Sequence, residues 1–410
     1  MTCLMPNGAR DSHAGERMKL LVLSHLFPSG SRPTLGLFVQ ERVRHMACSC
    51  EVTVVVPIKA TDVRRWRPCR ERFSNPNGNG GFDVWYLPLL SVPLVHWLTP
   101  LLLACRILSH GELRNAVRLA SVLDCHWTHP EAFAATLLGR IFSKPVFITL
   151  RGVEAFYRGQ GLIREFELGI ALSRAAGLVG LSTQLLELAE TAAGMPLKKS
   201  RVISNGVDTE RFRPGEQDSA RRNLGVPYQG MVFLSVGRLT PGKGFHRLIG
   251  CWQAFVRLHP GALLYVVGGD DPEDPSYRRK LTQQISTAGL ESHVFLAGEA
   301  RNQALVQWYQ AADFFLLASS SEGSPNVVLE ALASGLPCAV SDVGGVAEIL
   351  SDSGLGLLVT DLEQGWSQAL NSMVEKDWDR AQIRSAMLNR SWTRCADRAV
   401  AFMKEVLTDD

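Results

Sequence analysis

Short apolar runs recur along the whole chain, and the segments between most of them are long enough for helices. A continuous apolar run of this length, bounded by turn residues, is typical of a strand buried in a parallel sheet. The pattern predicts strands at residues 19–24, 51–56, 83–88, 122–127, 145–150, 177–182 and 201–204 of the first half. It predicts six more in the second half, at residues 231–236, 262–267, 293–298, 313–318, 337–340 and 356–359. Strands that alternate with helices form βαβ units and parallel sheets.

The alternation is interrupted once, at the polar stretch NGVDTERFRPGEQ of residues 205–217, and then restarts. A chain of 410 residues also exceeds the size of one typical hydrophobic core. We therefore expect an α/β protein with two doubly wound, Rossmann-like domains, at residues 1–215 and 216–390.

Two segments of the first half depart from this pattern. Residues 64–81 are rich in arginine and then in glycine and asparagine, which predicts a loop. Residues 85–105 are apolar over about the length of a membrane span. However, Pro88, Pro93 and Pro100 interrupt the segment, and His96 lies in its middle. We expect it to form part of the core or a groove wall, with shallow contact to a membrane as the alternative.

Charge is distributed unevenly although the net charge is only +3. Residues 1–215 contain 26 Lys and Arg against 17 Asp and Glu, a balance of +9, and residues 216–410 have a balance of −6. The first half is therefore expected to face an anionic partner or surface. No nucleic-acid-binding motif is present, so we expect no nucleic acid partner.

The cysteines and the N-terminus bear on the compartment. The nine cysteines include no CxxC pair, which argues for reduced thiols and against a zinc site. The first 17 residues lack the apolar core of a signal peptide, and Met18, just before the first strand, is an alternative start. We expect a cytoplasmic protein.

The stretch SEGSPNVVLEALASG, residues 321–335, follows the predicted strand 313–318. Ligands of open α/β sheets bind at the carboxyl ends of strands. Ser324 is a favourable N-cap and Pro325 a favourable first residue, so a helix is predicted to begin there. The free amides of Asn326 and Val327 would then suit a phosphate or a sugar hydroxyl.

Glu330 lies inside this helix, on a face of small residues without a basic partner. It can be a solvated glutamate, or a carboxylate that accepts hydrogen bonds from the two hydroxyls of a ribose. The stretch VGRLTPGKGF, residues 236–245, favours the second interpretation. It places Arg238 and Lys243 at the end of another predicted strand, where two cations can neutralise a diphosphate. A solvated loop is the alternative for that pair.

These motifs resemble those of the family-4 retaining glycosyltransferases, which have the GT-B fold. The resemblance rests on GRLTPGKG, EGSPNVVLE, SDVGGVAEIL, NGVDTERFRP and the N-terminal loop PTLGLF, and it runs from about residue 19 to the C-terminus. It implies transfer of a hexose-type sugar from a nucleoside-diphosphate sugar, linked to UDP or GDP, to a glycan or lipid-linked acceptor. By analogy with the family, the pathway is bacterial polysaccharide biosynthesis. The resemblance also implies that residues 391–410 form a C-terminal helix that packs back on the first domain.

The resemblance also assigns roles to residues. Arg238, Lys243 and Glu322 are the expected catalytic residues, the two cations acting on the leaving diphosphate and Glu322 lying near the sugar. The donor-binding residues are expected to be Gly36, Gly237, Arg238, Lys243, Gly298, Glu299, Glu322, Gly323, Ser324, Pro325, Asn326, Val327 and Glu330. The backbone around Gly298 and Glu299 would contact the nucleotide base, and Gly36 would let the N-terminal loop approach the diphosphate closely.

One position departs from the family. Many members have a His-Gly-x-Asp motif where this chain has RGVE, with Arg151 and Glu154 in the place of His and Asp. Arg151 could bind phosphate but could not transfer a proton at neutral pH. We take Arg151, Glu154 and His129 as candidates for contacts to the acceptor or phosphate, and His126 as a further histidine near the end of a strand.

No metal and no cofactor are expected, since two fixed cations can do the neutralising work of a divalent ion. The arginine-rich loop, with Arg64, Arg65, Trp66, Arg67, Arg70 and Arg72, is either a solvated loop or an anchor on an anionic membrane. Two other functions stay open. One is a catalytically degenerate sugar-nucleotide-binding module, and the other is a GT-B nucleotide-sugar epimerase.

Overall fold

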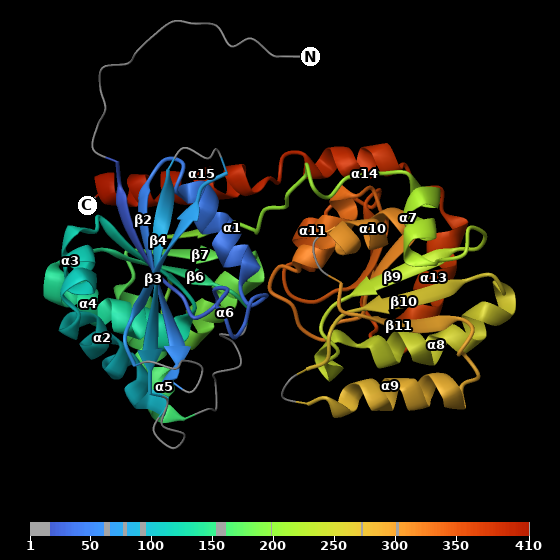
Figure 1. The fold of residues 1–410 in the computed structure, drawn as a ribbon, viewed down its shortest axis with the longest axis horizontal. Helices are drawn as coiled ribbons and strands as arrows, with labels where there is room; N and C mark the ends of the chain where they lie inside the picture. Colours follow the sequence, from blue (N-terminus) through green and yellow to red (C-terminus); the bar gives the residue numbers. More distant parts are fainter. Residues whose placement is uncertain are drawn as a thin grey trace, which may run out of the picture. The chain divides into compact units, whose positions relative to one another are not determined.

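A computed structural model describes residues 17–60, 66–76, 80–90, 96–152, 161–197, 199–271, 274–300 and 303–409, apart from the side chain of His96. The chain divides into two compact units, one ending at Phe147 and the other beginning at Ile148. The strands form an eight-stranded and a six-stranded sheet (Figure 1). The predicted domain boundaries at residues 215 and 390 stay predictions.

The eight-stranded sheet has the order β3-β4-β2-β1-β5-β6-β7-β8. Its strands are β1 (Lys19–Leu23), β2 (Glu51–Lys59), β3 (Cys69–Ser74), β4 (Gly81–Leu89), β5 (Val122–His126), β6 (Val146–Leu150), β7 (Gly177–Gly180) and β8 (Ser200–Val202). The helices of this part are α1 (Leu37–Met46), α2 (Thr99–Ser109), α3 (Gly111–Leu119), α4 (Phe133–Phe142), α5 (Leu162–Arg174) and α6 (Thr183–Ala193). Short helical turns lie at η2 (His96–Leu98) and η3 (Thr128–Ala132).

The six-stranded sheet is parallel and has the order β11-β10-β9-β12-β13-β14. Its strands are β9 (Val232–Val236), β10 (Leu263–Val267), β11 (Val294–Gly298), β12 (Phe314–Leu317), β13 (Cys338–Ser341) and β14 (Gly356–Val359). The helices are α7 (Gln217–Leu224), α8 (Phe245–Leu258), α9 (Ser276–Thr287), α10 (Gln303–Ala311), α11 (Asn326–Ala333), α12 (Val346–Ile349), α13 (Gly365–Glu375), α14 (Arg380–Met387) and α15 (Trp392–Thr408), with a helical turn η5 (Pro241–Lys243).

Both sheets have a topological switch point. In the second sheet, β9 lies between β10 and β12, so the chain leaves β9 toward one edge and later returns to the other side. In the first sheet, β1 lies between β2 and β5 in the same way. At such a point the loops after the two central strands diverge and leave a crevice at their carboxyl ends.

The alternation of side chains along the strands of the second sheet explains its two-sided core. Leu234 and Val236 belong to a buried cluster that includes α10 and α11, whereas Phe233 belongs to another that includes α8, α9 and α13. Successive strand residues point to opposite faces, so one apolar run supplies both clusters. Figure 1 shows α10 and α11 on one side of the sheet and α8 and α9 on the other.

All thirteen strands predicted from the apolar runs are present, within a residue or a few at their ends. The prediction that residues 64–81 form a loop is wrong in part, because β3 lies within them and pairs antiparallel with β4. The apolar pattern did not reveal β3 because five of its six residues are exposed on an edge strand. Phe73 is the exception, and its ring stacks on Phe82 of β4 with centroids 5.6 Å apart.

In the described part of the apolar segment 85–105, residues 85–89 end β4, residues 96–98 form η2 and residues 99–105 begin α2. Pro100 lies in the first turn of α2. Trp85, Leu87 and Leu103 are buried, in agreement with a place in the core. Within the described ranges, no helix combines the length and the hydrophobicity needed to cross a bilayer.

The long helix α15 contacts the last strands of the first sheet. Arg201 Nη2 lies 2.8 Å from Glu405 Oε1, and its guanidinium lies over the ring of Phe402. Arg398 Nη2 also donates to the carbonyl of Val202 at 3.0 Å. The second compact unit therefore contains both β8 and the C-terminal helix.

Candidate active site

The carboxyl ends of β9 and β12 meet at the switch point of the six-stranded sheet, and the two predicted motifs follow these strands. Residues 237–244 leave β9 and form the turn η5, and residues 318–325 leave β12. Ser320 joins the two loops, because its backbone N–H donates to the carbonyl of Gly242 at 2.8 Å. Motifs about 80 positions apart in sequence thus form one surface.

Lys243 and Glu322 form an ion pair across these loops. The Nζ of Lys243 lies 2.5 Å from Oε1 of Glu322, and the side chains are 28% and 11% exposed. The hydroxyl of Ser319 donates to the same oxygen at 2.6 Å. The sequence predicted that Lys243 binds the diphosphate of the donor, whereas in the structure its ammonium group pairs with the carboxylate of Glu322. A phosphate would compete with Glu322 for this ammonium group.

The SDVGG motif supports the loop that carries Glu322. Gly344 has φ of +62°, and a Cβ there would lie 1.6 Å from the carbonyl oxygen of Glu322. The backbone N–H of Gly345 donates to the carbonyl of Gly323 at 2.9 Å. Only glycine combines this left-handed conformation with so close an approach, so the motif fixes the height of the Glu322 loop above the sheet.

Helix α11 begins at Asn326, and its N-cap is Pro325. The predictions of Ser324 as N-cap and Pro325 as first helical residue are therefore wrong by one position. The hydroxyl of Ser324 is buried and has no hydrogen-bond partner among the described residues. It cannot cap the helix because the extended residue before the first turn is Pro325, with φ of −72° and ψ of 111°. The first amides of α11, at Asn326 and Val327, remain at the helix start as predicted.

Glu330 has a protein partner that the sequence did not reveal. The hydroxyl of Tyr309, on α10, donates to Oε2 of Glu330 at 2.8 Å. Burial raises the pKa of Glu330 to about 7, although the hydrogen bond from Tyr309 and the charge of Arg211 both act to lower it. Burial also raises the pKa of Tyr309, and the charge of Glu330 raises it further, so its hydroxyl stays protonated as a donor.

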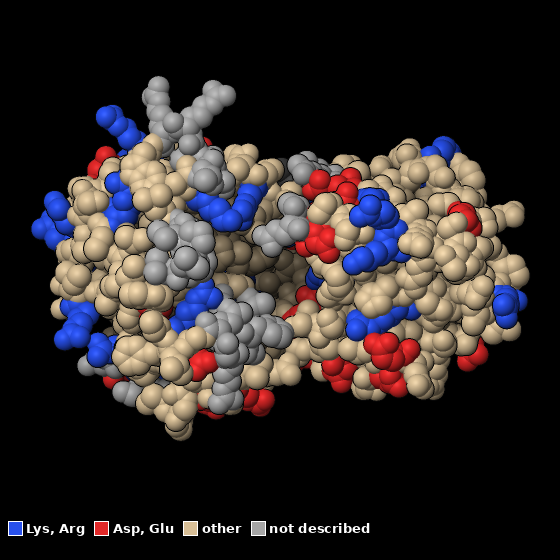
Figure 2. All heavy atoms as spheres, turned by 90° about the horizontal axis from the view of Figure 1, so that it is seen from below, with Lys and Arg blue, Asp and Glu red and all other residues tan. Residues whose placement is uncertain are grey.

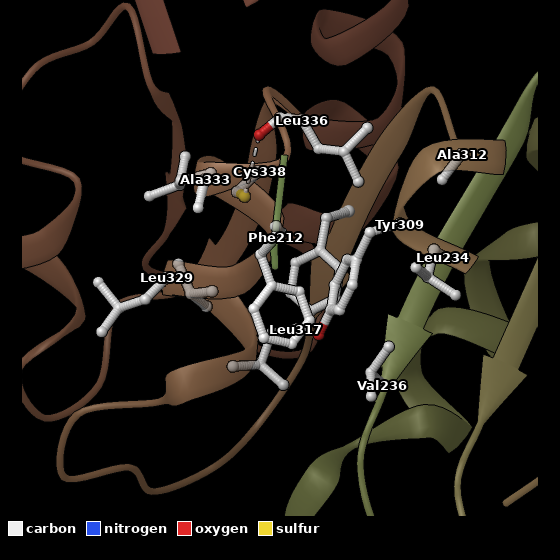
Figure 3. Close-up of a cluster of buried hydrophobic side chains, with 14 of the residues drawn as sticks. Phe212, Leu234, Val236, Tyr309, Ala312, Leu317, Leu329, Ala333, Leu336 and Cys338 are labelled. Carbon is white, nitrogen blue, oxygen red and sulfur yellow. Dashed lines mark hydrogen bonds between the residues drawn. The ribbon is translucent and has the colours of Figure 1, made fainter. Parts of the chain in front are cut away.

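The segment between the sheets holds Tyr309 in place. The ring of Phe212 packs edge-to-face against Tyr309 with centroids 5.6 Å apart, inside the buried cluster of Figure 3. Arg211 lies over the Phe212 ring at 5.1 Å. On the other side, Arg384 of α14 donates to the carbonyls of Thr209 and Phe212. Residues 209–212 are thus anchored directly beside the partner of Glu330.

The other predicted donor contacts lie at neighbouring strand ends. Gly237 follows β9, and Gly298 ends β11; Gly268, between them, donates to the carbonyl of Gly298 at 2.8 Å. Arg238 is exposed, and its guanidinium forms no hydrogen bond or ion pair with any residue that the structure describes. Glu299 is also exposed. This edge therefore offers a cation next to glycine backbone, which suits an anionic ligand.

Arg151, in place of the family histidine, is 8% exposed and lies at the end of a hydrogen-bonded chain. Its Nη1 donates to Oδ1 of Asn205 at 2.8 Å, and Nδ2 of Asn205 donates to Oδ1 of Asn326 at 2.9 Å. Gly323 lies close by, since a Cβ on it would be 2.7 Å from the Arg151 carbonyl oxygen. Glu154 is outside the described residues. Arg151 therefore contacts the start of α11 through Asn205.

Gly36 and His129 lie in the first compact unit. Gly36 precedes α1 with φ of +71°, and a Cβ there would lie 2.2 Å from the carbonyl of Leu26. His129 lies in η3, and His126 is fully buried with its Nε2 3.1 Å from Asp124. Roles of these residues toward a donor or acceptor stay predictions.

Two described arginines of the predicted membrane anchor, Arg70 and Arg72, have acidic partners. Arg70 lies 2.8 Å from Asp83 and 3.4 Å from Glu112, and Arg72 lies 3.3 Å from Asp83. Trp66 is 44% exposed, whereas Arg64 and Arg65 are outside the described residues. On the face drawn in Figure 2, Lys and Arg side chains lie at separate points. The acidic neighbours reduce the charge that Arg70 and Arg72 offer to an anionic surface.

Sequence reasoning missed four contributors to this site: Ser319, Tyr309, Asn205 and Gly344. Gly344 and Asn205 were within motifs named above but had no assigned role. Ser319 and Tyr309 carry no local signal, because their part in the site depends on which strands and helices are neighbours.

Comparison with known families agrees with this geometry. Residues 216–390 match the family described as "Glycosyl transferases group 1". Residues 216–390 therefore form a glycosyl transferases group 1 domain. The matched residues contain the Lys243–Glu322 pair, Tyr309 and Glu330.

Two curated glycosyltransferases are similar to this chain. It is 32% identical over 216 residues to a D-inositol 3-phosphate glycosyltransferase of Saccharomonospora viridis, a match that covers 50% of each chain. It is 26% identical over 348 residues to the putative teichuronic acid biosynthesis glycosyltransferase TuaC of Bacillus subtilis, covering 81% of this chain and 83% of TuaC. The chain thus spans about half the length of the first of these relatives.

Among solved structures, Anabaena Alr3699/HepE in complex with UDP matches with a TM-score of 0.72 at 19% identity. The match covers 95% of this chain and 100% of HepE. The two sheets with their helices and this likeness show that the chain has the GT-B fold.

Proposed function

We propose that the protein is a glycosyltransferase that moves a sugar from a nucleoside-diphosphate sugar to a hydroxyl group of an acceptor. The main support for this proposal is the ion pair between Lys243 and Glu322, which lies at the switch point of the six-stranded sheet. Arg238 and the first turn of α11 lie on the same sheet edge, and Glu330 follows one turn later.

In this proposal Arg238 and Lys243 act on the leaving group, and Glu322 acts on the sugar. Arg238 and Lys243 would neutralise the diphosphate as the bond to the sugar breaks, which is where negative charge develops. When phosphate takes the place of Glu322 beside Lys243, the freed carboxylate can accept hydrogen bonds from sugar hydroxyls. Retention of configuration at the anomeric carbon is part of the proposal and rests on the family resemblance.

The nucleoside would be held further along the same surface. The Oε2 atom of Glu330 is bonded to Tyr309, whereas Oε1 makes no hydrogen bond within the described part of the chain. We assign Oε1 to the ribose hydroxyls. The backbone at Gly298 and Glu299 is assigned to the base.

UDP is favoured as the nucleotide because HepE has been crystallised in complex with UDP and with UDP-glucose. The second of these complexes also favours a hexose as the transferred sugar. The acceptor would be a polyol or glycan, since the curated relatives are named for inositol 3-phosphate and for teichuronic acid biosynthesis. We further propose a role in bacterial polysaccharide biosynthesis, catalysis without a metal ion, and a cytoplasmic location with loose attachment to the inner face of the membrane.

Thermal unfolding with UDP, GDP and ADP tests the donor half of the proposal. A ligand at about 100 times its Kd adds about 2.7 kcal/mol to the free energy of unfolding, which gives a measurable rise in Tm. We expect one nucleotide to stabilise the wild type and Glu330→Ala to lose that response. Glu375→Ala, which removes an exposed glutamate of α13, is the matched control and should respond as the wild type does.

The result separates the alternatives. No shift with any of the three nucleotides would remove the donor site from the proposal. A shift without sugar transfer to any acceptor would favour a degenerate binding module, and release of free nucleotide without acceptor would favour an epimerase.

A further inference from the structure

The first sheet has its own pair of functional side chains at its switch point. His25 lies two residues beyond β1, and Glu131 lies in η3, which follows β5. Strands β1 and β5 are parallel neighbours, with Leu23 opposite Cys125 near their carboxyl ends. The pair thus occupies the position in its sheet that Lys243 and Glu322 occupy in the other, where ligands of open α/β sheets bind.

Glu131 fixes both the backbone and the ring of His25. Its Oε1 atom accepts a hydrogen bond from the backbone N–H of His25 at 2.7 Å and lies 2.6 Å from Nδ1. A carboxylate can only accept here, so the ring proton is assigned to Nδ1. Nε2 is then the second nitrogen, opposite the bound one. Trp127 packs edge-to-face against the ring at 5.5 Å and restricts its rotation.

Burial distinguishes the two members of the pair. Glu131 is fully buried, whereas the His25 side chain is 32% exposed. The other carboxylate oxygen, Oε2, is buried and has no hydrogen-bond partner among the described residues. A buried carboxylate that is hydrogen-bonded to one ring nitrogen of a partly exposed histidine orients the other ring nitrogen toward a reacting group.

A purely structural pair in the same unit provides a comparison. His126 and Asp124 lie 3.1 Å apart, and both side chains are 0% exposed, so this pair is enclosed by the core. His25 differs because its ring reaches the surface at the ligand-binding edge of the sheet. The structure therefore already contains a His–carboxylate pair for packing, and His25 is placed differently.

We propose that His25 binds the hydroxyl group of the acceptor through Nε2 and that Glu131 is its positioning residue. This inference rests on the proposed function and adds the acceptor contact to it. It also supplies a proton-accepting side chain that Arg151 cannot provide. The hydroxyl donates to Nε2, Nδ1–H donates to Glu131, and no other co-reactant is needed.

The charges around His25 define how the contact depends on pH. Burial lowers the pKa of His25, but the charge and hydrogen bond of Glu131 more than offset this, and the pKa lies above its ordinary value of 6.5. Arg32 acts in the opposite direction. Because Nε2 can accept only in the neutral ring, acceptor binding should strengthen as pH rises through this pKa. Glu131→Gln should move that rise to lower pH.

The first measurement needs no substrate. NMR titration of the histidine ring protons gives the pKa of His25 directly in the full-length protein. We expect a value above 6.5 in the wild type and a lower one in Glu131→Gln. His45→Gln, which removes another half-buried histidine beside a glutamate, should leave the titration of His25 unchanged. Equal His25 titration in the wild type and Glu131→Gln would overturn the positioning role.

The second measurement is transfer from radiolabelled UDP-glucose or GDP-mannose to 1D-myo-inositol 3-phosphate as the acceptor probe. His25→Gln should lower kcat/KM for the probe at least about tenfold, with UDP stabilisation of the protein unchanged. Glu131→Gln should lower it less and shift the acid limb of the pH profile. His45→Gln should match the wild type.

Each remaining outcome decides the question. Wild-type rates in His25→Gln overturn the inference, as does a loss of UDP binding in that variant equal to the loss of transfer. If the wild type is stabilised by UDP but transfers nothing to the probe, the donor site stands and the acceptor contact fails. If the wild type is not stabilised by any nucleotide, the proposed function itself fails.

Discussion

If Glu330 binds the ribose as proposed, its pKa of about 7 should make nucleotide binding depend on pH, and Tyr309→Phe tests this. The substitution removes one hydroxyl and keeps the ring that packs against Phe212. The hydroxyl donates to the carboxylate of Glu330 at 2.8 Å and lowers the pKa of that group. Without it, Glu330 will hold its proton to higher pH.

The size of the effect follows from the pKa of about 7. The wild-type carboxylate is about half ionised at pH 7. A hydrogen bond to a charged group contributes about 1.5–3 kcal/mol, and the low end of this range corresponds to about one pKa unit. The ionised fraction at pH 7 then falls from about one half to about one tenth. If the ionised form binds ribose, UDP affinity falls about fivefold at pH 7 and is nearly restored at pH 9.

Calorimetric titration of UDP between pH 6 and pH 9 measures this directly. Tyr265→Phe is the matched control, since Tyr265 belongs to the same buried cluster and packs on Phe295 without contacting Glu330. Its affinity should follow the wild type at every pH. A Tyr309→Phe variant with wild-type affinity at pH 7, or with the same loss at pH 7 and pH 9, would refute the reasoning.

Three further predictions concern the same site. Glu330→Gln should unfold at a higher temperature than the wild type at pH 8 but not at pH 4, and it should lose the stabilisation by nucleotide. The reason is that the pKa of Glu330 is raised in the folded protein, so ionising it lowers the free energy of unfolding as pH rises from about 4.5 to about 7. Lys243→Met should weaken UDP binding more than uridine binding by calorimetry, because it removes a phosphate partner; equal losses would exclude that role. Gly344→Ala should lower the free energy of unfolding by about 1–3 kcal/mol in urea titrations, since its Cβ would overlap the carbonyl of Glu322; an unchanged midpoint would contradict the close approach.

The apolar runs and the glycine-rich turns were sufficient to predict the two-sheet α/β fold, because both are local properties of the chain. A buried strand needs apolar side chains on both faces whatever its neighbours are. The strand β3 escaped this reasoning since an exposed edge strand needs little apolar surface, and its stabilising contacts, Phe73 on Phe82 and the arginines on Asp83, come from another strand.

The candidate residues of the second domain were also recognisable from sequence, but their partners were not. Lys243, Glu322 and Glu330 stood out as charged groups in apolar or glycine-rich surroundings. That Lys243 binds Glu322 depends on β9 and β12 being neighbours, and that Glu330 accepts from Tyr309 depends on how α10 and α11 pack on one face. The order of strands in a sheet is set by the packing of the whole domain.

The sequence by itself thus determined the buried strands, the motifs at their ends and the family resemblance. The tertiary structure decided which charges are neutralised, that Glu330 titrates near neutral pH, and that His25 and Glu131 form a pair. The physical reason is that ionisation and hydrogen bonding depend on distances of about 3 Å between groups far apart in the chain. Hydrophobic periodicity records only whether a residue is buried, and not what it is buried against.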